Sequence, residues 1–266
     1  MSLVDILKEY FGWTSLREPE GWFSPAHLIY VSIMIAITVW LAVWLGRKYR
    51  EKDLKSKTKV LGIAAVTMIA CELFKIVLFC VKDQTIATVR DNLPLWLCSI
   101  VLFSLPIAAF GKGRAREGAS DFTFCFGMLC AIAGTYLAGN YFNGSPVISF
   151  SVNMSVTTHC ISGFSALYIG AAELWSLKKK NIWISFAILG GFEALALVTN
   201  LINDPHQDNY MFFRESDGTP FSIVETIVGG NQILYTAFVM ALYFVYLAAF
   251  IGVVMLCRRA AGKKAA

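Results

Sequence analysis

Residues 93–110 read LPLWLCSIVLFSLPIAAF, an apolar run that contains no charged residue. Such a run is typical of a helix that crosses a bilayer, because about 20 apolar residues span the hydrocarbon core. Similar runs recur along the 266 residues, and only 15% of the residues are charged. Soluble domains average about 25%. The sequence therefore predicts an all-α, polytopic membrane protein built as a helical bundle.

The apolar runs predict seven transmembrane helices. They cover about residues 25–45, 60–81, 93–110, 122–137, 151–175, 182–203 and 231–257. Ser24 followed by Pro25 is a helix-entry signal before the first run. Residues 2–12 place their apolar side chains on one helical face, which is typical of a short interfacial helix lying on the membrane. We therefore expect an N-terminal interfacial segment (1–24), a seven-helix transmembrane domain (25–257) and a basic tail (258–266).

The basic residues predict the orientation. Of the 23 Lys and Arg residues, 17 lie in the tail and in the loops after the first, third and fifth runs. By the positive-inside rule, the N-terminus is outside and the C-terminus is cytoplasmic, in a multi-pass protein of the cell membrane. The charge of +5 lies beside apolar runs. We therefore expect membrane lipids as partners and no nucleic acid.

Polar residues inside the predicted helices gather in the outer halves of the runs. They are His27, Cys98, Ser99, Asn153, Ser155, Thr157, Thr158, His159, Thr199, Asn200, Asn203, Asn231, Gln232 and Tyr235. The inner halves of the odd-numbered runs are almost wholly apolar, whereas a channel carries polar residues along its whole length. This asymmetry predicts a polar cavity that opens towards the outer leaflet.

Cys98 and His159 lie at similar predicted depths, so they can form a nucleophile–base pair. Position alone favours a plainer interpretation, in which Cys98 is a small packing residue and His159 a buried, hydrogen-bonded one. Glu72 and Lys75 share a helix face and can form an ion pair. Glu72 can instead orient a histidine. No HxxxH or CxxC spacing is present, and we expect no metal and no cofactor.

Five motifs occur in register along the chain. They are FSPAHL (23–28), ACEL (70–73), LPLWLCS (93–99), THC (158–160) and NLIN…DNYMFF (200–213). Together they resemble the YwaF family of bacterial integral membrane proteins, over about residues 10–255. That family is similar to a eukaryotic seven-span family with lipid acyltransferase activity, in which a cysteine of the third span and a histidine are implicated.

The resemblance implies a lipid-acyl-modifying enzyme, either an acyltransferase or a hydrolase. Its catalytic residues are expected to be Cys98, His159 and Glu72. The expected substrate-binding residues are His27, Asn200, Asn203, Asn209 and Tyr210, with the asparagines as hydrogen-bond donors to an oxyanion and the loop from Asn209 as a cap. A non-enzymatic binder or transporter of a small molecule or lipid that uses the same cavity is the alternative. A structural membrane subunit is a third possibility.

Overall fold

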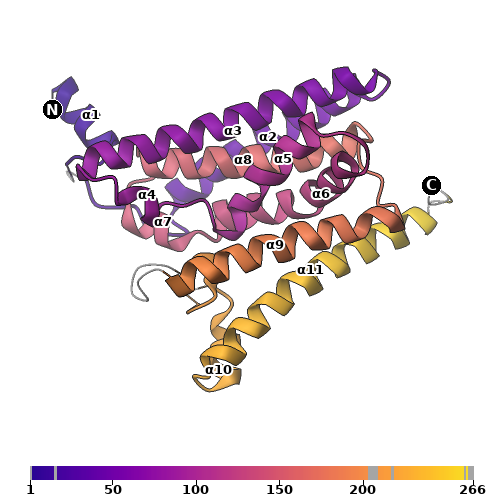
Figure 1. Ribbon diagram of the computed structural model, residues 1–266. Coiled ribbons are helices and arrows are strands. Elements are labelled where there is room, and N and C mark those ends of the chain that lie inside the picture. Colours follow the sequence, from indigo (N-terminus) through magenta and orange to yellow (C-terminus); the bar gives the residue numbers. More distant parts are fainter. Residues whose placement is uncertain (1, 15–16, 203–208, 217–218, 261, 263–266) are drawn as a thin grey trace.

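The computed structural model describes residues 2–14, 17–202, 209–216, 219–260 and 262, and these residues form helices and connecting segments without a strand (Figure 1). The helices are α1 Leu3–Tyr10, α2 Pro25–Tyr49, α3 Leu54–Asp83, α4 Thr88–Asp91, α5 Ile100–Phe110, α6 Gly113–Tyr136, α7 Gly139–Gly144, α8 Phe150–Ala171, α9 Lys179–Ile202, α10 Ser222–Val228 and α11 Gln232–Ala260. Two short 3₁₀ turns are η1 Leu97–Ser99 and η2 Tyr210–Phe212. The expectation of an all-α protein is confirmed.

Among the residues that the structure describes, five segments are long and apolar enough to cross a membrane. They are α2, α3, the segment Gly113–Gly144 that holds α6 and α7, α9, and α11. The apolar segment Leu97–Phe110 is shorter. α8 has 22 residues, but it carries several buried polar side chains. The protein is therefore a multi-pass membrane protein, whereas the count of seven crossings and the orientation stay predictions.

Local signals explain where the helices begin. Ser24 is the N-cap of α2: its side chain accepts a hydrogen bond from the amide of His27 at 3.2 Å, and Pro25 occupies the first helical position. A proline at that position loses no intrahelical hydrogen bond. α1 has a capping box between Ser2 and Asp5. The predicted start of the first long helix and the short N-terminal helix are thus confirmed, and the position of α1 on a membrane stays a prediction.

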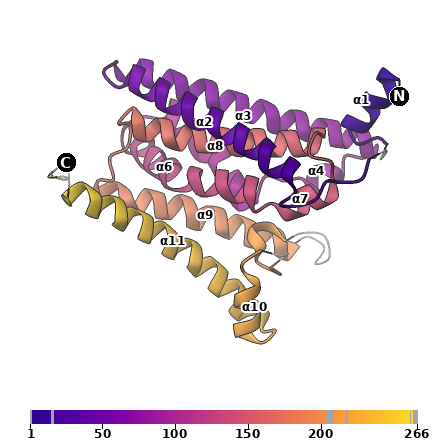
Figure 2. The same cartoon turned by 180° about the vertical axis from the view of Figure 1, so that it is seen from behind.

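α8 lies in the centre of the bundle and packs against α6, α2 and α3 (Figures 1 and 2). A Cβ atom at Gly127 of α6 would overlap Ala166 and the backbone of Ser162 in α8. A Cβ atom at Gly163 would overlap Ala131 of α6. Small residues let two helices approach closely, and this contact fixes α8, and with it His159, against α6.

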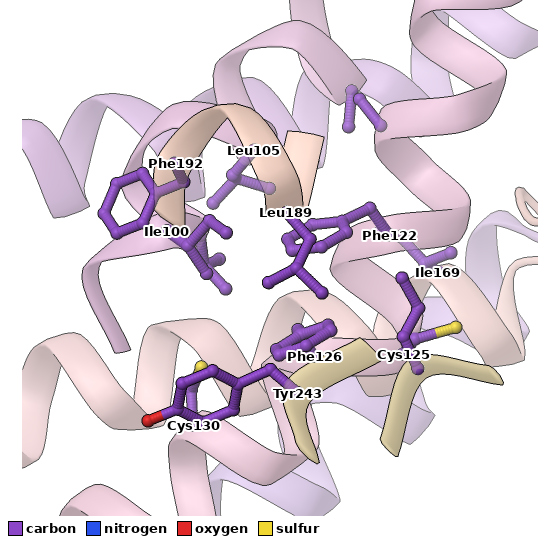
Figure 3. Packing of buried hydrophobic residues seen from close by; sticks show 14 of the residues in the cluster. Ile100, Leu105, Phe122, Cys125, Phe126, Cys130, Ile169, Leu189, Phe192 and Tyr243 are labelled. Carbon is purple, nitrogen blue, oxygen red and sulfur yellow. The ribbon is translucent and has the colours of Figure 1, made fainter. Parts of the chain in front are cut away.

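The larger apolar core joins α5, α6, α9 and α11 (Figure 3). Two of its buried rings, Phe122 and Phe126, stack with their centroids 4.7 Å apart. Leu189 of α9 and Val239 of α11 pack into the same cluster and are fully buried. The outer faces of the long helices carry exposed apolar side chains, including Ile33. Exposed apolar faces of this kind contact lipid in a membrane protein.

The third apolar run corrects the predicted helix over residues 93–110. Leu93–Trp96 is not helical, η1 follows it, and α5 begins only at Ile100. Trp96 has an extended backbone, and its ring packs against Tyr210 at 5.6 Å between centroids. Proline also disfavours a helical conformation at the residue before it. Cys98 therefore lies in the first turn of the helix, whereas a helix that began at residue 93 would place it more than one turn inside.

The fifth run is also shorter than the predicted 151–175. α8 ends at Ala171, and Glu173 and Leu177 in the following link have φ angles of 55° and 44°. Such left-handed backbone interrupts a right-handed helix. The link turns the chain towards α9 and forms part of the wall of a cavity at that end of the bundle.

Candidate functional site

Cys98 and His159 line the same small cavity. The other lining residues are Met68 and Glu72 of α3, Ser99 of η1, Leu102 of α5 and Thr158 of α8. Its volume is about 20 Å³, which is enough for about one water molecule. Cys98, Ser99 and Thr158 are half-buried, so the cavity lies close to the surface of the bundle. In this state it is too small for an acyl chain.

The hydrogen bonds of His159 fix the state of its ring. Its Nδ1 lies 2.6 Å from the carbonyl oxygen of Ser155, one turn earlier in α8. A carbonyl oxygen only accepts hydrogen bonds, so Nδ1 carries the proton, and in a neutral imidazole Nε2 then holds the lone pair. The Cys98 thiol and this side chain line the same cavity. Nε2 is therefore the atom that can take the thiol proton.

Gly134 of α6 makes room for the histidine ring. A Cβ atom at this position would overlap both Cδ2 and Nε2 of His159. One turn earlier, the Cys130 Sγ donates a weak hydrogen bond to the carbonyl oxygen of Leu97, at 3.7 Å. This face of α6 therefore holds both halves of the pair: it supports the turn that carries Cys98, and it packs against the ring of His159.

Glu72 and Lys75 form the predicted ion pair, with 2.7 Å between Lys75 Nζ and Glu72 Oε1. Lys75 also lies within electrostatic range of Cys98 and His159. The Nδ1 proton of His159 is held by Ser155, so the histidine has an orienting group other than Glu72. The charge of Lys75 near the thiol is thus balanced by Glu72.

The position of Cys98 at a helix start also stabilises negative charge on its sulfur. It lies in η1, at the N-terminal end of the helix that continues as α5. The positive end of a helix dipole stabilises negative charge at this position. Together with a nearby lysine, this is the kind of environment in which cysteines react as thiolates.

His27 lies in a different place and is fully engaged. Its Nδ1 accepts a hydrogen bond from the Phe23 amide at 3.0 Å, and its Nε2 donates to the carbonyl oxygen of Thr135, also at 3.0 Å. The ring is buried and lies 3.8 Å from that of Phe142, centroid to centroid. His27 fastens the start of α2 to the end of α6, and it is not among the lining residues of the Cys98 cavity.

The other predicted binding residues shape the loop around η2. The side-chain amide of Asn200 donates to the carbonyl oxygen of Tyr210 at 2.9 Å and accepts from its amide at 3.0 Å. Asn209 accepts from the amide of Arg214 at 2.9 Å. Asn203 lies outside the described residues. Asn200 and Asn209 hold the loop, and the loop in turn packs its aromatic rings against Trp96, next to Cys98.

Two positioning residues are missed by the sequence interpretation. Ser155 lies four residues before His159, a spacing at which a side chain can reach back to the preceding turn, so this signal is present in the sequence. Gly134 gives no such signal, because its role depends on the packing of α6 against α8. Among the described residues, no group of three or more His, Cys, Asp or Glu side chains is arranged to hold a metal ion.

Comparison with known proteins corrects the family that the five motifs resemble. No curated protein and no solved structure matches the chain. The family model that does match covers residues 22–256 and is not that of the YwaF family. The resemblance to YwaF proteins is therefore wrong, because its short motifs are common to apolar helices and do not separate one membrane family from another. The chain belongs to the TMEM164 family.

Proposed function

We propose that this protein is a lipid-acyl-modifying enzyme in which Cys98 is the nucleophile and His159 the general base. The observation that carries the proposal is the state of His159. Its Nδ1 is held by the carbonyl of Ser155, and its side chain lines the same small cavity as the Cys98 thiol. A nucleophile, a base within reach and a group that orients the base are the elements that covalent catalysis requires.

The reaction has two steps. In the first, His159 Nε2 takes the thiol proton and Cys98 Sγ attacks the carbonyl carbon of a lipid ester. The ester C–O bond breaks, and the leaving alcohol takes the proton from the imidazolium, which leaves a thioester on Cys98. In the second, an acceptor alcohol or water gives its proton to Nε2 and attacks the thioester. The C–S bond breaks, and the imidazolium gives its proton to the departing thiolate, which restores the Cys98 thiol and the neutral imidazole.

The first turn of the helix offers donors for the oxyanion. The first amide groups of a helix lack intrahelical acceptors, and Leu97 and Cys98 are the first residues of η1. Amide groups aimed at the developing negative charge lower the barrier to acyl transfer. We assign this role to the turn, because the amides of Asn200 and Asn209 are already bonded inside their loop.

A lipid substrate would enter from the side of the bundle. The half-buried residues of the cavity come from η1, α5 and α8, and the buried ones from α3 and α8, so access from the bilayer requires these elements to separate. The aromatic loop around η2 contacts Trp96, two residues before Cys98. Movement of this loop would free the turn that carries the nucleophile, and the loop thus serves as the cap of the site.

The same proposal includes seven crossings, with the N-terminus outside the cell membrane. Adding α5 with η1, and α8, to the five long apolar segments gives seven. The basic loops favour the orientation. Reaction of single cysteines in the α2–α3 loop with a membrane-impermeant maleimide, in intact cells and in lysed cells, tests it. Labelling in intact cells would contradict the orientation.

The alternative is a binder or transporter that uses the cavity without covalent chemistry. The test places the purified protein in nanodiscs with a phospholipid that carries a tagged acyl chain, with and without an acceptor alcohol. Products are followed by mass spectrometry. We expect acyl transfer or release by the wild type and by Cys71→Ala, a matched intramembrane control, and none by Cys98→Ala or His159→Ala. Turnover that is equal in all four proteins would refute the dyad.

A further inference from the structure

A second, larger cavity has a volume of about 270 Å³. The segments that line it lie at the end of the bundle opposite α1, on the right in Figure 1. The cavity forms where the α2–α3 loop, the start of α6 and the link between α8 and α9 meet. Three of its lining residues are cationic: Lys52, Lys57 and Arg116. It shares no lining residue with the Cys98 cavity, so a role for this second cavity is independent of the proposed function.

The carboxylates of this cavity are already paired with cations outside its lining. Glu117 Oε1 lies 3.3 Å from Lys178 Nζ. Glu173 forms an ion pair with Arg50. Because these partners balance the two negative charges, the three cations of the lining face the cavity without a neutralising acid of their own.

The cationic side chains of this lining have N–H donors that are not engaged in hydrogen bonds. Lys57 Nζ donates one hydrogen bond, to the carbonyl oxygen of Ala172 at 2.9 Å, and an ammonium group has three donors. Among the described residues, neither Lys52 nor Arg116 has a hydrogen-bond or ion-pair partner for its side chain. Lys57 and Arg116 are half-buried, so a ligand that met them would be partly shielded from water.

The wall of the cavity is held in place by its own contacts. The buried carboxylate of Asp121 accepts from the amides of Ser176 and Leu177 at 2.7 and 3.0 Å. Arg258 of α11 lies over the ring of Trp175, 4.5 Å from its centroid. The α8–α9 link is therefore fixed to both α6 and α11, and the cavity is a feature of the fold and not of a loose loop.

We propose that this cavity binds the phosphate group of an anionic membrane lipid. Unpaired lysine and arginine donors suit phosphate oxygens. The cavity lies at the ends of apolar helices long enough to cross a membrane, which is the depth of lipid headgroups, and basic pockets between such helices bind anionic headgroups. A soluble phosphate compound offers the same chemistry, and the test separates the two sources.

The test compares full-length protein in mixed micelles that contain phosphatidylglycerol or phosphatidylcholine, with bound lipid counted by native mass spectrometry. The variant is the double substitution Lys52→Ala and Arg116→Ala. Its control, Lys55→Ala with Lys179→Ala, removes two exposed charges from the same end of the bundle. Lys57 is left intact, because it also ties α3 to the end of α8.

We expect wild type and control to retain phosphatidylglycerol in preference to phosphatidylcholine, and the cavity variant to bind it about tenfold or more weakly for each lost contact. Equal weakening in both double variants would reduce the effect to general surface attraction and overturn the proposal. A second arm adds inorganic phosphate and follows thermal unfolding. If phosphate stabilises the wild type but phosphatidylglycerol is not retained, a lipid source is excluded. Unchanged unfolding of the cavity variant without ligand shows that the fold is intact.

Discussion

Gly134→Ala is the substitution that most sharply tests the packing around His159. The new Cβ would overlap Cδ2 and Nε2 of the imidazole. The ring cannot simply turn away, because its Nδ1 is bonded to the carbonyl oxygen of Ser155 at 2.6 Å. Relief of the overlap therefore requires either a shift of α6 from α8 or the loss of that hydrogen bond.

Both routes cost stability. Overpacking a well-packed contact costs about 1–3 kcal/mol, and a buried polar group that loses its partner costs about 1–3 kcal/mol. Whichever route is taken, we expect Gly134→Ala to lower the free energy of unfolding by about 1–3 kcal/mol. If the proposed function holds, acyl transfer falls as well, by about 100-fold for a displacement of about 1 Å at the base. Thermal unfolding in micelles and the nanodisc turnover assay measure the two effects.

A double-mutant cycle isolates the contact. In a His159→Ala background the ring is absent, and Gly134→Ala is expected to cost less than about 1 kcal/mol, which gives a coupling energy of about 1–3 kcal/mol. Gly191→Ala in α9 is the control, because a Cβ there meets nothing within 4 Å. It should leave stability unchanged or raise it by up to about 1 kcal/mol. Additive costs at Gly134 and His159 would refute the reasoning.

Three further substitutions test other parts of the site and the bundle. Glu193→Met is expected to raise the unfolding free energy by about 1–3 kcal/mol, since both carboxylate oxygens are buried without a hydrogen-bond partner among the described residues; a lower midpoint in thermal unfolding would contradict this. Lys75→Met leaves Glu72 without its ion-pair partner and is expected to lower the free energy of unfolding by up to about 3–5 kcal/mol. Glu72→Gln in the double variant should recover much of this loss, and no recovery would mean that the broken ion pair does not cause it. His27→Ala removes two hydrogen bonds and should lower the free energy of unfolding by about 1–3 kcal/mol. The protein that remains folded should keep its turnover, and a loss of turnover beyond the loss of folded protein would place His27 in the site.

Much of the fold can be predicted from the sequence, because it depends on local composition. Apolar runs locate every long helix, and Ser24 with Pro25 locates the start of α2. The spacing of Glu72 and Lys75 is enough to predict their ion pair, because residues three apart share a helix face. Each of these features depends on residues that are close in the chain.

The features that depend on tertiary packing cannot be predicted in this way. The run from Leu93 looks like a helix throughout. Pro94 disfavours helix only at the residue before it, and the contact of Trp96 with the loop around η2 explains why regular helix begins later still. Asn200 looks like a free donor in an apolar run, but its amide is engaged by the backbone of that loop. The motifs also indicate the wrong family, because short motifs in apolar helices carry little information on ancestry.

The site itself is predicted in part. Similar depth suggests that Cys98 and His159 can meet, and the structure places both in one cavity. The sequence offers Glu72 either as the ion-pair partner of Lys75 or as the orienting group of a histidine, and in the structure the histidine proton is held by Ser155. That difference arises because a backbone carbonyl one turn away satisfies the ring without any residue from another helix.

The covalent intermediate gives the most direct test of the central claim. Wild-type protein in nanodiscs is incubated with phospholipid without an acceptor, digested, and analysed by peptide mass spectrometry. We predict an acyl adduct on the peptide that contains Cys98, removed by neutral hydroxylamine as a thioester is, and absent from His159→Ala. An unmodified Cys98 peptide under conditions in which the wild type turns over lipid would contradict the account.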